Sequence, residues 1–403
     1  ADRLKPDHQL YKVLKSLGTS FGVEKLEVYL AKLGNKIALE NTDPISVIVG
    51  GDLVRKYKDR EQRFLLGRAA LGLRDVRDFS ASCNPLGAPP GVAAVVAGVD
   101  SSRYPDDQCR ELRVALATQL GSGVDNIVVG NGSAELIWLL ALAYLRPDDT
   151  VLIVGPTFGE YERAAAVHGA RAVVYRAQES EDFLPDVTEI IGLVQSQTPR
   201  LVFLCNPNNP TGFYLRSDTV ERLLTACDDS LLVVDEAYIG FVSDQDCLLD
   251  LVDRGAVLLR SMTKDCGLAG LRLGYAVASQ EVSETLTKVR PPWSVNAVAQ
   301  AAGLAALADV QHLATAREAV AESKTYLAAE LTRLGLRVVP SAANFVMVRV
   351  GDARRFRAAL LARRCCVRDC TSFGLPEFIR IGVRPLADCR TLVTAIREVM
   401  RAS

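Results

Sequence analysis

The chain has few histidines and no run of apolar residues long enough to cross a membrane. Only three of its 403 residues are histidine. None of them, His8, His168 or His312, lies in a motif discussed below, which argues against a catalytic system built on histidine. The longest apolar run, residues 136–145, is interrupted by a tryptophan and a tyrosine and is typical of a buried helix. We therefore expect neither a histidine-activated nucleophile nor a membrane partner.

The chain also lacks a strong net charge and a cysteine framework. Its formal net charge is -1, so nothing favours a nucleic acid as partner. The ten cysteines are scattered, and no cysteine or histidine spacing fits a zinc site. Disulfide frameworks belong to short secreted chains, and the N-terminus is charged from Asp2 onward. We expect reduced thiols, no metal, no secretory signal and a cytoplasmic location.

Lysine is scarce after residue 67, where only Lys264, Lys288 and Lys324 remain, whereas eight lysines lie before residue 60. This shift predicts that residues 1–75 form an N-terminal extension, whose role the sequence does not define. Inside it, residues 23–33 have helical periodicity, and residues 45–49 form a short β-branched run.

Alternating strand and helix patterns follow the extension. A chain of this length with 49% hydrophobic residues predicts more than one domain. We expect an N-terminal arm at 76–100, a large α/β domain at 101–325 and a smaller α+β domain at 326–403. In the large domain a mostly parallel seven-stranded sheet is expected between layers of helices. Its predicted strands are residues 127–129, 151–154, 172–175, 201–204, 231–234, 256–259 and 275–278. A long helix from about 325 leads to predicted strands near 338, 345–350 and 378–383 and helices at 352–364 and 387–401.

The most informative segment is residues 261–275, because it places a lysine directly after a buried strand. Lys264 follows the hydroxyl groups of Ser261 and Thr263, and Arg272 comes soon after among three glycines. This pattern suits a lysine that forms a Schiff base beside a bound phosphate. A surface lysine in a glycine-rich loop is the alternative, and this segment alone does not decide between the two.

Four more strand ends carry polar or aromatic residues. Ser133, in the turn at 130–135, could help bind a phosphate or could simply cap a helix. Phe158 could stack on a planar ring or fill the core. The turn at 206–212, with three asparagines and two prolines, could aim an amide at a ligand, or these residues could serve only to shape the turn. Asp235 would be partly buried, so it needs a cationic partner, either a protonated pyridine nitrogen or an arginine.

A further arginine interrupts an apolar run near the C-terminus. Arg380 lies within residues 378–383, which are otherwise aliphatic, aromatic or glycine. Arginine is seldom buried without an anion, so Arg380 could grip a substrate carboxylate through its two parallel N–H groups. An arginine that faces water from an edge strand is equally compatible with the sequence.

Taken together and in this order, the motifs N-P-N-N-P-T-G, D-E-A-Y, S-M-T-K and G-L-A-G-L-R resemble the fold type I pyridoxal 5'-phosphate enzymes of the aminotransferase class I/II family. The resemblance covers roughly residues 75–403. Within the family, the segments 78–87 and 368–376 look most like the branch of L-threonine O-phosphate decarboxylases and histidinol-phosphate aminotransferases.

The resemblance implies a role for each matching residue. Lys264, Asp235 and Tyr238 would be catalytic, with Lys264 bound to the cofactor and Asp235 keeping its pyridine nitrogen protonated. Substrate would be bound by Arg380, Arg368 and Asn84. The cofactor would be bound by Ser133, Ala134, Phe158, Asn209, Asp235, Tyr238, Ser261, Thr263, Lys264 and Arg272, and by Tyr104 from the neighbouring subunit of a homodimer.

The expected activity is aminotransfer on a small amino acid or amine, with or without a phosphate group. A decarboxylase or another lyase of the same branch is the alternative, and a non-catalytic binding protein on the same fold is a third. The motifs do not separate the first two, because the orientation of the substrate decides which bond at Cα breaks.

Overall fold

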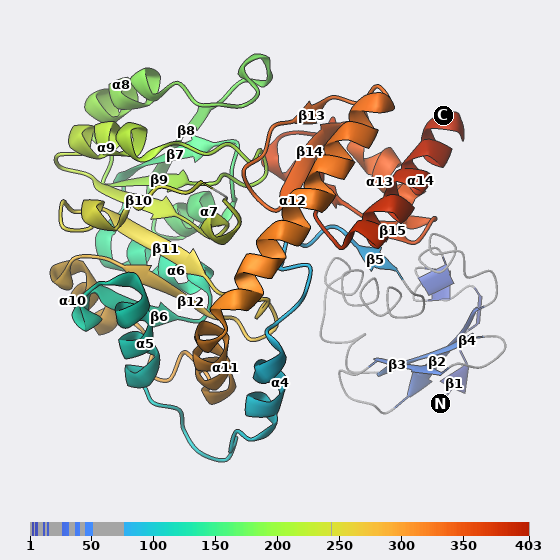
Figure 1. Cartoon of the computed structure of the whole chain (residues 1–403), viewed down its shortest axis with the longest axis horizontal. Helices are drawn as coiled ribbons and strands as arrows, with labels where there is room; N and C mark the ends of the chain where they lie inside the picture. The colour runs from blue at the N-terminus through green and yellow to red at the C-terminus, as the bar shows by residue number, and fades with distance from the viewer. Residues whose placement is uncertain are drawn as a thin grey trace.

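The computed structural model of the chain describes residues 2–3, 5–6, 11–12, 14–15, 26–31, 37–40, 45–50, 76–242 and 244–402 (Figure 1). In this described part, no helix is both long enough and apolar enough to cross a bilayer. Two further units follow the N-terminal strands. We call the elements from α4 to α11 the large domain and those from α12 to α14 the small domain.

The large domain is built on a seven-stranded sheet with the order β6-β12-β11-β10-β9-β7-β8. Only β12 runs antiparallel to its neighbours, so the predicted mostly parallel sheet is confirmed. All seven predicted strands form. They are β6 (Ile127–Gly130), β7 (Thr150–Gly155), β8 (Arg171–Arg176), β9 (Leu201–Cys205), β10 (Leu231–Asp235), β11 (Val257–Ser261) and β12 (Gly274–Val277).

Helices cover both faces of this sheet because successive residues of each buried strand point to opposite sides. Val202 and Leu204 join one core, whereas Leu201 and Phe203 join the other. The first core contains residues of α4 (Pro90–Ala97), α5 (Arg110–Leu120), α8 (Val187–Gln197), α9 (Ser217–Ala226) and α11 (Ala297–Ala308). The second contains residues of α6 (Ser133–Tyr144), α7 (Glu160–Val167) and α10 (Gln280–Val289).

The small domain contains an antiparallel sheet with the order β13-β14-β17-β16. Figure 1 shows α12 as a long helix that begins beside α11 and ends against this sheet. It starts at Val310, so the predicted start near 325 is wrong; Asp309 caps its first turn. The small domain comprises α12 (Val310–Arg333), β13 (Val338–Val339), β14 (Phe345–Arg349), α13 (Ala353–Leu361), β16 (Arg368–Asp369), β17 (Phe378–Gly382) and α14 (Leu386–Ala402).

A segment before α4 connects the two domains. Its strand β5 (Arg77–Asp78) pairs in parallel with β15 (Cys365–Cys366) of the small domain. The backbone N–H of Asn84 then donates to the Lys264 carbonyl of the large domain at 2.8 Å. We call residues 76–89 the strap. Short 3₁₀ turns complete the chain: η1 (Val124–Asn126), η2 (Glu179–Glu181), η3 (Ile239–Phe241), η4 (Leu249–Leu251) and η5 (Cys370–Phe373).

The N-terminal extension forms a small sheet with the order β1-β2-β4-β3. Its strands are β1 (Asp2–Arg3), β2 (Leu26–Ala31), β3 (Ile37–Glu40) and β4 (Ile45–Gly50), so the predicted β-run at 45–49 is confirmed. The helical prediction for 23–33 is wrong over 26–31. Apolar residues at 26, 28 and 30 also fit a strand, and pairing of β2 with β4 decides in its favour. Most of the predicted 1–75 extension lies outside the described residues.

Candidate active site

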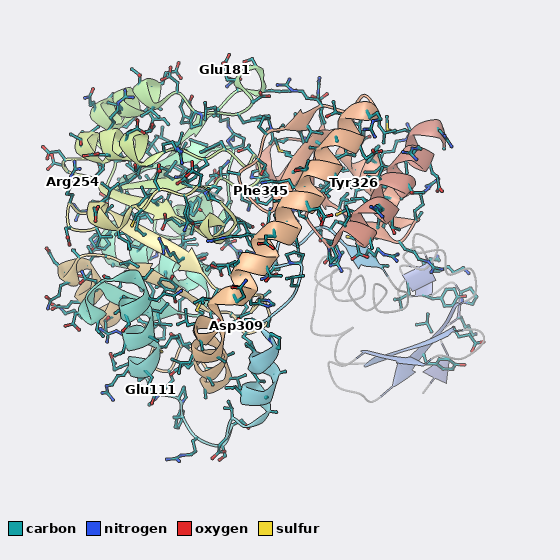
Figure 2. The ribbon with its side chains drawn as sticks, in the orientation of Figure 1. Glu111, Glu181, Arg254, Asp309, Tyr326 and Phe345 are labelled. Atoms are coloured by element: carbon teal, nitrogen blue, oxygen red, sulfur yellow. The ribbon has the colours of Figure 1, made fainter. Side chains whose placement is uncertain are left out.

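A cavity of about 430 Å³ opens at the carboxyl ends of the parallel strands, the place where α/β sheets bind ligands. The small domain closes one side of it. Phe345, which Figure 2 labels near the middle of the molecule, forms a T-shaped pair with the Tyr238 ring, with 5.1 Å between the ring centroids. Twelve of the fourteen predicted site residues line this cavity: Ser133, Ala134, Phe158, Asn209, Asp235, Tyr238, Ser261, Thr263, Lys264, Arg272, Arg368 and Arg380.

Lys264 lies in the turn that follows β11. Its ammonium lies 5.7 Å from the centre of the Tyr238 ring, and no hydrogen bond or ion pair to it is found within the described part of the chain. The turn itself is held firmly. Ser261 and Thr263 share a hydrogen bond of 2.6 Å, and the Lys264 carbonyl accepts from the strap. The backbone of Lys264 is therefore fixed while its amine remains available for covalent chemistry.

An anion cradle forms where α6 begins beside Arg272. Gly132, not Ser133, is the N-cap of α6, so the interpretation of Ser133 as an ordinary cap is wrong. A Cβ atom on Gly132 would come within 2.8 Å of an Arg272 guanidinium nitrogen. A Cβ atom on Gly274 would come within 2.5 Å of the Ser133 nitrogen. The two glycines thus allow a helix N-terminus and a guanidinium to converge, a combination that suits a phosphate.

Asp235, at the end of β10, is only 3% exposed, and none of the arginines in the described part of the chain pairs with it. Its carboxylate accepts hydrogen bonds from the Tyr161 hydroxyl at 2.7 Å and from the Ala237 N–H at 3.0 Å. Burial raises the pKa of Asp235, whereas these two hydrogen bonds and the charge of Lys264 lower it. The arginine alternative applies instead to the next residue, because Glu236 pairs with Arg260 at 2.9 Å.

The three asparagines of the turn at 206–212 have different partners. Asn206 exchanges two hydrogen bonds with the backbone of Leu215, and Asn208 donates to the Pro156 carbonyl and to Thr211. These contacts fix the turn. Asn209 instead accepts a hydrogen bond from Arg380 across the cavity. Both sequence interpretations therefore apply, with Asn206 and Asn208 shaping the turn and Asn209 available to a ligand.

Arg380 belongs to β17, which has a neighbouring strand on each side, and it is 7% exposed. The edge-strand alternative is therefore wrong. Besides its bond to Asn209, it donates to the Ser80 carbonyl at 2.9 Å and lies over the Phe345 ring at 5.1 Å. Its Nε is buried and has no partner in the described structure. A buried guanidinium with a spare donor suits an anionic ligand.

Arg368 provides a second positive group at the outer part of the same cavity. It is exposed, donates to the Ser372 hydroxyl at 2.8 Å and lies over the Phe373 ring at 5.5 Å. These contacts orient the guanidinium without neutralising its charge. The cavity thus contains one buried and one exposed arginine on the side formed by the small domain.

Two predicted site residues lie outside the cavity. Asn84 does not line it, because its amide is already used: it donates to the Asp265 carbonyl at 2.8 Å and accepts from the Leu86 N–H at 2.9 Å. The prediction of Asn84 as a substrate ligand is therefore not supported by its contacts, which join the strap to the Lys264 turn. Tyr104 is 80% exposed and packs on Trp293 at 4.6 Å.

The sequence interpretation did not assign eight residues that line the cavity, namely Ser80, Gly159, Glu160, Tyr161, Cys205, Ala237, Ser372 and Phe373. Three of them lie beside predicted motifs: Glu160, Tyr161 and Cys205. Tyr161 could have been found from its sequence position, three residues after Phe158. In the structure the two rings meet edge to face, with 5.8 Å between their centroids. Cys205 is the last residue of β9, directly before the asparagine turn. Glu160 starts α7 and accepts from the Trp138 indole N–H at 3.1 Å.

These residues fit pyridoxal 5'-phosphate. The cradle of Ser133 and Arg272, which a Cβ on Gly132 or Gly274 would fill, could hold the phosphate. Phe158 could cover one face of the pyridine ring, and the Asp235 carboxylate could accept a hydrogen bond from its protonated nitrogen. Lys264 is the amine that could bind the cofactor covalently.

Comparison with known proteins agrees with this fit. The family model for aminotransferase class I and II matches residues 87–396. A histidinol-phosphate aminotransferase of Moorella thermoacetica is 38% identical over 339 residues, which cover 82% of this chain and 87% of that protein. The solved histidinol-phosphate aminotransferase of Sinorhizobium meliloti, in complex with pyridoxal-5'-phosphate, is similar with a TM-score of 0.77 and 27% identity, covering 86% of this chain and 98% of that one.

A second solved structure represents the other activity of the branch. The L-threonine-O-3-phosphate decarboxylase of Porphyromonas gingivalis matches with a TM-score of 0.72 and 25% identity over 81% of this chain and all of that one. The curated relative reported above is more similar in sequence and is named as an aminotransferase. The chain therefore belongs to the aminotransferase class I and II family and is an aminotransferase that depends on pyridoxal 5'-phosphate.

Proposed function

We propose that this aminotransferase acts on a small amine that carries a phosphate or carboxylate group, with histidinol phosphate as the first candidate. The observation that carries the proposal is the pair of arginines on one side of the cavity. Arg380 is buried with an unpartnered Nε, and Arg368 is exposed and oriented by Ser372. The names of the curated relatives support a phosphorylated substrate.

In this proposal each residue of the cavity has a defined task. When bound, the cofactor supplies an electron sink for the electron pair left at Cα of the substrate. Lys264 attaches the cofactor and moves the proton at Cα, and Asp235 holds the proton on the pyridine nitrogen. Tyr238 and Asn209 orient the ring through its 3'-oxygen. The bond that breaks must lie perpendicular to the ring, so the two arginines, by orienting the substrate, would decide which bond at Cα that is.

We also propose that the active unit is a homodimer in which Tyr104 reaches the cofactor phosphate of the partner. Its high exposure and its packing on Trp293 support this, because a large aromatic pair at the surface is a frequent feature of interfaces. Closed twofold dimers are the commonest oligomers. A Tyr104→Phe dimer should bind the cofactor more weakly, and a fully active monomer in light scattering would contradict the proposal.

We propose as well that the chain divides near residues 75, 100 and 325, with α12 (Val310–Arg333) running across the last boundary, and that the protein is cytoplasmic. All ten cysteines lie in the described part of the chain and are unpaired, which supports a reducing compartment.

A screen of amine donors against several keto acids tests the substrate proposal. Histidinol and histidinol phosphate form the decisive pair, because they differ only in the phosphate. We expect aminotransfer with a much lower KM for the phosphorylated donor and no release of carbon dioxide from amino acids. Arg368→Gln should raise that KM about tenfold to a hundredfold, as expected for a lost charge-assisted contact.

The control for this variant is Arg354→Gln, because Arg354 is exposed and lies outside the cavity, 3.9 Å from Asp369. It should leave the KM unchanged. Equal KM values for the two donors, or carbon dioxide released at each turnover, would reject the proposed substrate class.

A further inference from the structure

Tyr161 joins the two walls of the cofactor cavity from a fully buried position in α7. Its ring stacks on Phe203 with 4.8 Å between centroids and an interplanar angle of 11°. The same ring meets Phe158 edge to face. Its hydroxyl donates to Asp235 Oδ2 at 2.7 Å. Tyr161 therefore contacts both Phe158, which could cover the pyridine ring, and Asp235, which could bind the nitrogen of that ring.

The direction of the hydrogen bond to Asp235 is fixed. Burial, followed by the nearby charge of Asp235, raises the pKa of Tyr161 well above its usual value, so the phenol keeps its proton and acts as a donor. The Ala237 N–H is a donor to the other carboxylate oxygen. An ionised carboxylate accepts on both oxygens, whereas a protonated one must itself donate its proton. The two donors thus favour the anion.

The other charged or titratable groups around Asp235 do not replace this contact. From the end of β9, the Cys205 thiol has a pKa raised by burial, so it is neutral. Glu236, on the same strand end, is engaged by Arg260. From the turn after β11, Lys264 faces Asp235 as a positive charge, but this amine is the one expected to bind the cofactor. The hydroxyl of Tyr161 and the Ala237 N–H are therefore the hydrogen-bond donors that the described part of the chain supplies to the carboxylate.

We propose that Tyr161 is a positioning residue, which keeps the Asp235 carboxylate ionised and aimed at the pyridine nitrogen and supports Phe158 with its ring. Burial alone raises the pKa of Asp235 and the hydroxyl lowers it, so removing the hydroxyl moves this pKa upward. An Asp235 that takes up a proton cannot stabilise a protonated pyridine nitrogen. The acid limb of the profile of kcat/KM against pH therefore moves to higher pH when the Tyr161 hydroxyl is removed.

The test uses Tyr161→Phe, which removes one oxygen and retains the ring, with Tyr144→Phe as the matched control. Tyr144 is a half-buried tyrosine outside the cofactor cavity, on α6 beside Arg200. Two quantities are measured against pH: kcat/KM, and the affinity of the cofactor-free protein for pyridoxal 5'-phosphate, followed by absorbance. We expect Tyr161→Phe to shift the acid limb upward and, at pH values between the wild-type limb and the shifted limb, to weaken cofactor binding about tenfold to a hundredfold. The control should match the wild type.

A second background separates positioning from a general structural effect. With Asp235→Asn in place there is no carboxylate to keep ionised, so Tyr161→Phe should add little further loss and no shift of the limb. The inference is overturned if Tyr161→Phe lowers kcat/KM by the same factor at every pH, or if its effect persists undiminished in the Asp235→Asn background. Neither result depends on which amine is the substrate, so the proposed function is tested separately.

Discussion

The geometry of Gly274 leads to a sharp prediction about cofactor binding. Gly274 opens β12 directly beneath the first turn of α6. A Cβ atom there would lie 2.5 Å from the Ser133 nitrogen, 2.9 Å from the Arg260 carbonyl oxygen and 2.9 Å from the Gly132 carbonyl carbon. All three are backbone atoms of ordered elements, so no side-chain rotation relieves the contact. Gly274→Ala must therefore push the helix terminus and the strand apart.

The size of the effect follows from this overpacking. Forcing one extra carbon into a packed site costs about 1–3 kcal/mol. The cofactor-free protein can relieve the strain by moving the turn at 130–133 outward, but binding of the phosphate requires the turn to return. The strain then weakens binding by up to the full amount, which corresponds to roughly 5-fold to 150-fold in the dissociation constant. We expect Gly274→Ala to lose cofactor affinity by this factor.

Gly270→Ala is the matched control, because Gly270 lies in the loop that leads into β12 and a Cβ atom there would meet nothing within 4 Å. Cofactor-free protein is titrated with pyridoxal 5'-phosphate while absorbance is followed, and thermal unfolding of the same samples without cofactor measures any general loss of stability. Gly270→Ala should bind like the wild type. Wild-type affinity in Gly274→Ala, or equal losses in both variants, would refute the reasoning.

Three further predictions concern the cofactor and the extension. Lys264→Ala should remove the covalent link between protein and cofactor, and a link that borohydride still reduces in this variant would contradict the assignment. Asp235→Asn should retain the cofactor but slow chemistry at Cα by several orders of magnitude; a loss of less than about tenfold, or 1.4 kcal/mol, would make Asp235 structural only. Removal of residues 1–66 should preserve the yellow colour while raising KM or lowering kcat, since every cofactor motif follows residue 75. Loss of cofactor, or unchanged kinetics and dimerisation, would each reject this last prediction.

The large domain could be predicted from sequence because its strands are buried on both faces. The sequence of such a strand is a continuous run of β-branched and aliphatic residues. It can be recognised without detecting an alternation of apolar and polar residues. The strand β2 shows where this fails. Apolar residues at 23, 26, 30 and 33 fit a helix, whereas those at 26, 28 and 30 fit a strand. Only pairing with β4, which is 14 or more residues further along the chain, decides between them.

Most of the cavity could also be predicted, because its residues follow strand ends in recognisable motifs. Arg380 marks the limit of that approach. Its sequence context fits a buried anion site and a solvent-facing edge equally well. The choice depends on β16, a two-residue strand that pairs with β17 and makes it internal, and a strand of that length has no periodicity to detect.

Asn84 and Tyr161 show why partners are harder to predict than positions. An asparagine side chain offers two donors and an acceptor, and its sequence context does not say which group will use them. In the fold, the strap returns to the Lys264 turn, and the backbone and amide of Asn84 are both bound there. A residue expected to contact substrate therefore holds the backbone of the turn at Lys264 and Asp265 instead. Tyr161 is the converse case: its place in α7 suggests a core aromatic, and only the 2.7 Å contact with a carboxylate 74 residues away gives it a chemical part in the site.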